Sequence, residues 1–144
     1  MVKSTNNAKN HPLRRCLIEE ALSTCPVIGI LRGVEPECAE GIGQALFDVV
    51  VRVMEVPLNA PEPFKSISGL VRLFERRVVI GAGTVLTDED VRIVAAAGGR
   101  LVVSPNTNSG VIEETKRCSL VFMPGFFRST EAFRALAAGL VKTQ

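Results

Sequence analysis

The sequence predicts an α/β protein built on a parallel β-sheet. Short apolar runs recur about every 20–26 residues and alternate with segments of helical periodicity, a spacing that is typical of repeated βα units. The leading run, PVIGIL, has no polar alternation, as expected for a strand that is buried on both faces. The 144 residues, 47% of them apolar, are enough for one domain with a real hydrophobic core.

Five segments have the composition of strands. The first, Pro26–Leu31, is a continuous apolar run, and the second, Val49–Val56, is rich in β-branched residues. The other three are shorter: Val78–Ile80, Leu101–Val103 and Leu120–Met123. Leu140–Val141 could begin a sixth strand.

Helices are predicted between the strands. Pro36 suits the first turn of a helix over Glu35–Phe47, and Pro61–Phe74 carries an apolar stripe at helical spacing. Thr87 is expected to cap a helix that runs through Ala97. The last two helices are expected over Ser109–Arg117 and, after a cap at Ser129 or Thr130, through Ala138.

The polar residues 1–10 are predicted to be a disordered tail that leads into a short helix, so the domain is expected to span residues 11–144. Parallel strands with helical crossovers fit either an open doubly wound sheet or part of a (β/α)₈ barrel. The periodicity does not distinguish these two architectures.

Composition and charge exclude several classes of protein. The net charge is only +2 and the basic residues are scattered, which argues against a nucleic-acid partner. No apolar run is long enough for a membrane span, and residues 1–10 lack the apolar middle of a secretory signal. The four cysteines match no metal-binding or redox spacing, so we expect reduced, mostly buried thiols in a cytoplasmic protein that has no metal site.

Polar residues follow the predicted strands. Carboxyl ends of parallel strands share one face, where ligands bind, so these residues should converge although they are far apart in sequence. They are Arg32 after the first strand, Glu55 and Asn59 at the end of the second, Thr84 after the third, and Pro105 and Asn106 after the fourth.

Glu55 lies among Val and Met residues, where an isolated carboxylate would be costly to desolvate. It is therefore either paired with an arginine such as Arg32 or tuned as a general acid/base. Arg32 itself could instead clamp an oxyacid by a bidentate pair.

The segment Gly81-Ala82-Gly83-Thr84 matches neither a dinucleotide fingerprint nor a Walker loop. We expect its glycines to let the backbone approach a ligand closely and Thr84 to donate its hydroxyl.

Several segments together resemble one enzyme family, the 2-keto-3-deoxy-6-phosphogluconate and 6-phosphogalactonate aldolases. They are PVIGILRG (26–33), MEVPLNAP (54–61), GAGTVL (81–86), VSPN (103–106), and Pro124–Gly125 with TEAF (130–133). These motifs occur in the family's order and at nearly its spacing, from about Cys25 to Gly139. Asn59 and Asn106 favour the phosphogalactonate branch.

The resemblance implies an incomplete TIM barrel of about five βα units plus the start of strand six, and a homotrimer without a metal or cofactor. It implies a class I aldolase that forms a Schiff base and cleaves the phosphorylated sugar acid to pyruvate and glyceraldehyde 3-phosphate. On this resemblance Glu55 is the general acid/base, Arg32 and Thr84 bind the keto acid, and Asn59, Pro105 and Asn106 belong to the same substrate-binding mouth.

The chain also departs from the family. Gln144 stands where the Schiff-base lysine is expected, and Lys142 is a weaker candidate for that role. A barrel needs at least about 200 residues, so we expect a C-terminally truncated member with no appreciable turnover on its own. The alternative is a non-catalytic α/β remnant that serves as a keto-acid binding or interaction module.

Two other segments differ from the family pattern. Phe126 and Phe127 replace small residues, and they should either narrow the pocket or cover core that missing strands expose. Val49–Val50 replaces an Ala-Gly pair, which should make that loop stiffer or reshape it. An incomplete barrel also leaves strand edges open to self-association.

Overall fold

The computed structural model describes residues 11–137. The predicted tail (1–10) and the predicted start of a sixth strand lie outside these residues, as do Lys142 and Gln144. Helices and strands alternate along the described chain in the order α1 (His11–Thr24), β1 (Ile28–Ile30), α2 (Pro36–Asp48), β2 (Val53–Pro57), α3 (Pro63–Phe74), β3 (Val79–Gly83), α4 (Asp88–Ala96), β4 (Leu101–Ser104), α5 (Ser109–Arg117), β5 (Val121–Pro124) and α6 (Ser129–Ala137).

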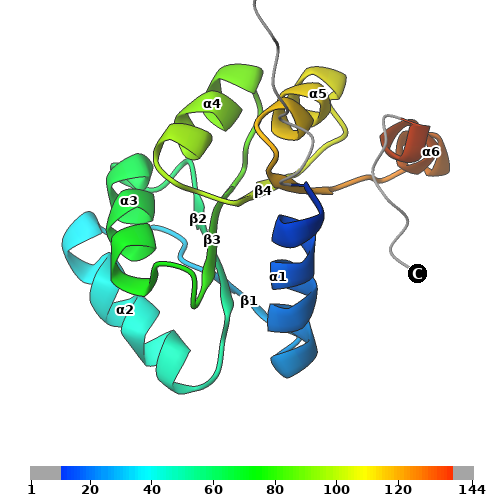
Figure 1. The fold of residues 1–144 in the computed structure, drawn as a ribbon. Coiled ribbons are helices and arrows are strands. Elements are labelled where there is room, and N and C mark those ends of the chain that lie inside the picture. Colours follow the sequence, from blue (N-terminus) through cyan, green and yellow to red (C-terminus); the bar gives the residue numbers. More distant parts are fainter. Residues whose placement is uncertain (1–10, 138–144) are drawn as a thin grey trace, which may run out of the picture.

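The five strands form one parallel sheet in the order β1-β2-β3-β4-β5. A doubly wound sheet reverses its strand order at a switch point, whereas a (β/α)₈ barrel adds each strand next to the previous one. The sequential order therefore resolves the choice that periodicity left open. The fold is an incomplete (β/α)₈ barrel of five βα units, with its helices arranged around the sheet (Figure 1).

The two faces of the sheet are covered differently. On the outer face, Met54, Val56 and Ile80 pack in one core with buried residues of α3, α4 and α5. On the inner face, Ile18 of α1 packs against buried side chains of the three central strands, Val53, Val79 and Leu101. The crossover helices thus cover one face of the sheet and α1 covers the other (Figure 1).

The helix starts follow the local sequence closely. Pro36 and Pro63 occupy first-turn positions of α2 and α3, where no backbone N–H is needed. Thr87 caps α4 as predicted, because its hydroxyl accepts from the Asp90 N–H while the Asp90 carboxylate accepts from the Thr87 N–H. Asn108 caps α5 through its side-chain oxygen, which accepts from the N–H groups of Gly110 and Val111.

The link between α2 and β2 differs from the prediction. The predicted strand Val49–Val56 begins only at Val53, because Val49 ends the helix and Val50 turns the chain. Val50 has φ 63°, a left-handed conformation that strains a β-branched side chain. The reversal from helix to strand therefore overrides the strand propensity of these two valines.

Two groups of side chains are more exposed than expected. Phe127 is fully exposed and Phe126 is 60% exposed, so neither ring covers the core, while narrowing of the pocket by these rings stays a prediction. Cys38 is exposed and both Cys25 and Cys118 are only partly buried, so the three described thiols are free, and the expectation that most of the thiols are buried is wrong for them. The side chain of Cys16 lies outside what the structure describes.

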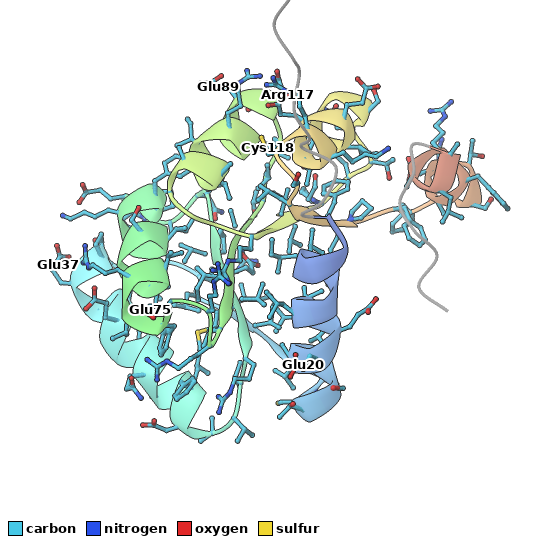
Figure 2. All side chains as sticks on the ribbon, viewed as in Figure 1. Glu20, Glu37, Glu75, Glu89, Arg117 and Cys118 are labelled. Carbon is cyan, nitrogen blue, oxygen red and sulfur yellow. The ribbon has the colours of Figure 1, made fainter. Side chains whose placement is uncertain are left out.

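An ion-pair network links α4 to α5. Arg92 contacts Glu89 at 2.7 Å and reaches Glu114 at 3.7 Å, and Arg117 contacts Glu114 at 2.6 Å. Figure 2 shows Arg117 and Cys118 at the end of α5, on the same side of the molecule as Glu89 of α4. The hydrogen bond from Arg117 holds the pKa of Glu114 below its usual range.

The outer strands leave open edges. In the described part of the chain, β1 pairs only with β2 and β5 pairs only with β4. Ile30, at the end of β1, is 56% exposed. None of the described helices has both the length and the apolarity needed to cross a membrane.

Candidate active site

The predicted site residues lie at the carboxyl edge of the sheet. The register places Ile30 beside Glu55 and Glu55 beside Gly81, so the ends of β1, β2 and β3 are direct neighbours. The N–H of Leu31 donates to the Glu55 carbonyl at 2.9 Å, which holds the segment before Arg32 against β2. Arg32, Glu55 and Thr84 therefore come from three adjacent strands.

Glu55 is a buried carboxylate on the inner face of β2. It is 5% exposed, and its Oε2 atom is buried without a hydrogen-bond partner. Burial raises the pKa of Glu55 above its ordinary value of 4.5, and the positive charge of Arg32 opposes part of that rise. A carboxyl group with a raised pKa and a free oxygen is suited to giving and taking protons as a general acid/base.

Arg32 acts on Glu55 through its charge rather than through a contact. Within residues 11–137, the structure records no ion pair between the two side chains, and Arg32 is exposed at the rim. The interpretation of Glu55 as a simple ion-paired carboxylate is therefore wrong. The Arg32 guanidinium is exposed to solvent, where it can bind an anionic group of a ligand.

The two glycines of the GAG segment pack closely against other parts of the protein. The segment was predicted to follow the third strand, but Gly81 and Gly83 lie within β3. A Cβ at Gly83 would collide with both carboxylate oxygens of Glu55, and a Cβ at Gly81 would collide with the Leu101 carbonyl. The absent side chains make room for Glu55 and for the neighbouring strand. Close approach of this backbone to a ligand stays a prediction.

Thr84 follows β3 in a strained conformation. Its φ of 56° lies in the left-handed region, which β-branched residues rarely adopt. Strain of this kind persists where the surrounding contacts determine the backbone path, and it is concentrated at functional sites. The side chain of Thr84 is partly exposed at the same edge as Glu55.

The remaining predicted residues are more exposed. Asn59 lies in the turn after β2, while Pro105 and Asn106 follow β4. Ser104, which the sequence argument did not single out, is 1% exposed and hydrogen-bonds within this edge. The sequence signal that could have identified it is a serine at the end of the apolar run Leu101–Val103, directly before the Pro-Asn pair.

The described residues contain no cluster of metal ligands and do not include the candidates for the covalent step. Between residues 11 and 137, no three His, Cys, Asp or Glu side chains are placed to hold a metal ion. Lys142 and Gln144, named for the covalent step, lie outside the described residues.

Glu55→Gln is expected to remove a pH dependence from folding stability. Because the pKa of Glu55 is raised above 4.5, the folded state binds the proton more tightly than the unfolded state. The free energy of unfolding should therefore fall as pH rises from 4.5 through the raised pKa, and stay lower above it. Urea unfolding of both proteins across this window should show the variant gaining relative stability as pH rises.

Glu114→Gln is the matched control for this measurement. The pKa of Glu114 is lowered, first by the Arg117 hydrogen bond, so its contribution is lost as pH falls. This variant should lose relative stability as pH rises toward 4.5 and then change little above 4.5, where Glu55→Gln should gain relative stability. A stability difference for Glu55→Gln that does not change with pH would contradict the assignment.

A comparison with protein-family models finds one match. The model described as "KDPG and KHG aldolase" matches residues 18–144. The match includes all five described strands and the predicted site residues.

Curated relatives agree with the family model. The chain is 48% identical over 114 residues to a probable 2-dehydro-3-deoxy-6-phosphogalactonate aldolase of Rhizobium meliloti, covering 79% of this chain and 54% of the relative. It is 40% identical to the 2-dehydro-3-deoxy-6-phosphogalactonate aldolase of Escherichia coli K12, covering 79% and 56%. The chain spans about half the length of these curated relatives.

Solved structures share the fold as well as the sequence. A structure titled "Native KDPGal structure" aligns with a TM-score of 0.77 at 40% identity, covering 79% of this chain and 55% of that one. The KDPG aldolase of Legionella pneumophila, captured with pyruvate as a covalent carbinolamine intermediate, aligns with a TM-score of 0.76 at 30% identity and covers 83% and 57%.

Proposed function

The chain belongs to the KDPG and KHG aldolase family, and from this membership we propose that it carries the acid/base and keto-acid binding part of a class I aldolase site. The proposed substrate is 2-dehydro-3-deoxy-6-phosphogalactonate or its 6-phosphogluconate counterpart, cleaved to pyruvate and glyceraldehyde 3-phosphate. The observation that carries the proposal is Glu55, a buried carboxyl with an unpartnered oxygen at the carboxyl edge of the sheet.

Glu55 is proposed as the general acid/base. In a Schiff-base aldolase, a lysine amine adds to the C2 carbonyl, the carbinolamine loses water, and the iminium accepts the electron pair when the C3–C4 bond breaks. Each of these steps moves a proton on or off oxygen or carbon. A carboxyl whose pKa is raised by burial and whose Oε2 is free of partners can exchange those protons.

Arg32 and Thr84 are proposed to bind the keto-acid end of the substrate. Arg32 supplies a positive charge after β1, and Thr84 supplies a hydroxyl after β3, on the other side of β2. Asn59, Pro105 and Asn106 are proposed to line the same mouth. Their exposure at the edge of the sheet leaves them accessible to a substrate.

The 144 residues have no lysine at the position where the family resemblance places the nucleophile of the covalent step. Gln144 stands where the family resemblance expects the lysine, and Lys142 is the weaker candidate. We propose that the 144-residue polypeptide binds keto acids without appreciable turnover. We also propose that residues 11–144 form one domain, that the protein is cytoplasmic, and that it assembles as a homo-oligomer, with a trimer expected from the family.

Pyruvate titration of the 144-residue chain followed by NMR tests the binding proposal. Pyruvate is expected to shift the amide resonances of the strand ends near Arg32 and Thr84. Arg32→Gln should weaken binding by about 10-fold to 150-fold, because a charge-assisted hydrogen bond contributes about 1.5–3 kcal/mol. The control is Arg72→Gln, an exposed α3 residue that is paired with Glu40 at 3.4 Å, which should leave pyruvate affinity unchanged.

Borohydride trapping in the presence of pyruvate tests the covalent step. No reduced adduct is expected on the 144-residue chain. A mass-shifted adduct on Lys142 would overturn the proposal that turnover is absent and would assign Lys142 as the nucleophile. Equal pyruvate affinity for the parent and Arg32→Gln would contradict the proposed role of Arg32.

A further inference from the structure

Hydrogen bonds join the three loops that follow β3, β4 and β5. The Thr107 hydroxyl donates to the Gly125 carbonyl at 3.1 Å, and the Asn108 side-chain amide donates to the Leu86 carbonyl at 3.3 Å. The centre of this network is Ser104, the last residue of β4. These loops carry the proposed substrate residues of β3 and β4, so the network lies directly beside the site.

The Ser104 hydroxyl contacts the loop after β3 and the loop after β4. Its hydroxyl is buried, 2.8 Å from the Val85 carbonyl and 3.1 Å from Asn106 Oδ1. A serine hydroxyl has one hydrogen to donate, so these two acceptors share one donor. A hydroxyl this deeply buried is costly unless it is paired, and both of its acceptors belong to the edge of the site.

The hydrogen bond from Ser104 to Val85 helps to fix the backbone next to Thr84. The N–H of Val85 donates to the Val103 carbonyl at 3.2 Å, and its carbonyl accepts from Ser104. Val85 is thus held to β4 through both of its backbone groups. This attachment fixes the position of the chain directly after Thr84, whose φ of 56° needs external support.

We propose that Ser104 is a positioning residue, whose buried hydroxyl sets the orientation of Thr84 and Asn106 for binding of a 2-keto acid. The proposal rests on the proposed function for its ligand. Ser104 itself is buried beneath the loop and acts through these two residues. Ser104 links the ends of β3 and β4. Neither the VSPN motif nor the family match assigns this role to it.

The test compares Ser104→Ala with Thr115→Val in the 144-residue chain. Thr115 is also fully buried, and its hydroxyl donates to the Val111 carbonyl at 2.6 Å inside α5. Both variants remove one buried hydroxyl, but only Ser104→Ala affects the edge of the site. Circular dichroism first establishes that each variant is folded.

Two NMR measurements then decide the proposal. In the ligand-free protein, Ser104→Ala should shift the Thr84 backbone amide and the Asn106 side-chain amide, and Thr115→Val should shift neither. In a pyruvate titration, Ser104→Ala should bind about fivefold to tenfold more weakly than the parent, as expected for loss of one hydrogen bond. Thr115→Val should retain the parent affinity.

Unchanged Thr84 and Asn106 resonances in Ser104→Ala would overturn the positioning role. Equal pyruvate affinity for Ser104→Ala and the parent would overturn it as well. Failure of the parent chain itself to bind pyruvate would instead count against the proposed function. In that case the ligand-free resonances would still decide whether Ser104 orients Thr84 and Asn106.

Discussion

Gly81→Ala is expected to lower the free energy of unfolding by ~3 kcal/mol or more, the upper end of what overpacking costs. A Cβ at this position would overlap the Leu101 carbonyl of the neighbouring strand. Gly81 is paired with Leu101 in the sheet, so the clash can be relieved only by separating β3 from β4. Because domains are stable by only about 5–15 kcal/mol, this loss is a large share of the total.

Urea unfolding followed by circular dichroism measures this effect, and the chain offers a control of the same type. Gly41 lies in α2 with no atom within 4 Å of a built Cβ. Gly41→Ala should therefore stabilise the protein by ~0.5–1 kcal/mol, through improved helix propensity and a less flexible unfolded chain. Equal unfolding midpoints for Gly81→Ala and the parent would contradict the packing argument.

Gly83→Ala is expected to cost ~1–3 kcal/mol and to displace the Glu55 carboxylate. Here the colliding atoms are the two oxygens at the end of a flexible side chain. Glu55 can rotate away, so the protein should remain folded while the candidate active site is lost. NMR titration should show the pKa of Glu55 returning toward its ordinary value of 4.5 as the carboxyl leaves its buried position.

A double-mutant cycle separates this collision from any other effect of the alanine. In a Glu55→Ala background the obstruction is gone, so Gly83→Ala should cost close to nothing and the coupling energy should be ~1–3 kcal/mol. In a Glu55→Gln background the side chain keeps its size, so the full cost should remain. A coupling energy near zero with Glu55→Ala would show that Gly83 does not make room for Glu55.

The elements of the fold could largely be predicted from local sequence. The predicted helix Ser109–Arg117 matches α5 without any shift. Thr87 caps α4 as expected, because a cap depends on residues within one turn of it. The second strand was predicted four residues too early at Val49, because the chain must reverse direction after α2 and that requirement outweighs the β propensity of valine.

The sequence predicts which residues share the candidate site, but it does not predict how their side chains interact. Parallel strands bring their carboxyl ends to one edge, so a sequence pattern could place Arg32, Glu55, Thr84 and Asn106 together without knowing any contact. Their interactions depend on neighbours far away in sequence. The absence of an Arg32–Glu55 ion pair among the described residues and the hydrogen bonds of Ser104 follow from side-chain placement.

Local strand and helix signals are enough to predict a parallel α/β chain with Glu55 at a strand end, and the set of motifs adds the resemblance to the aldolases. The surroundings of Glu55 depend on tertiary packing. The strand order made the sheet part of a barrel, and pairing of β2 with β3 placed Gly83 where its missing side chain admits the carboxylate. Burial, and with it the raised pKa of Glu55, comes from packing between residues that are distant in the chain.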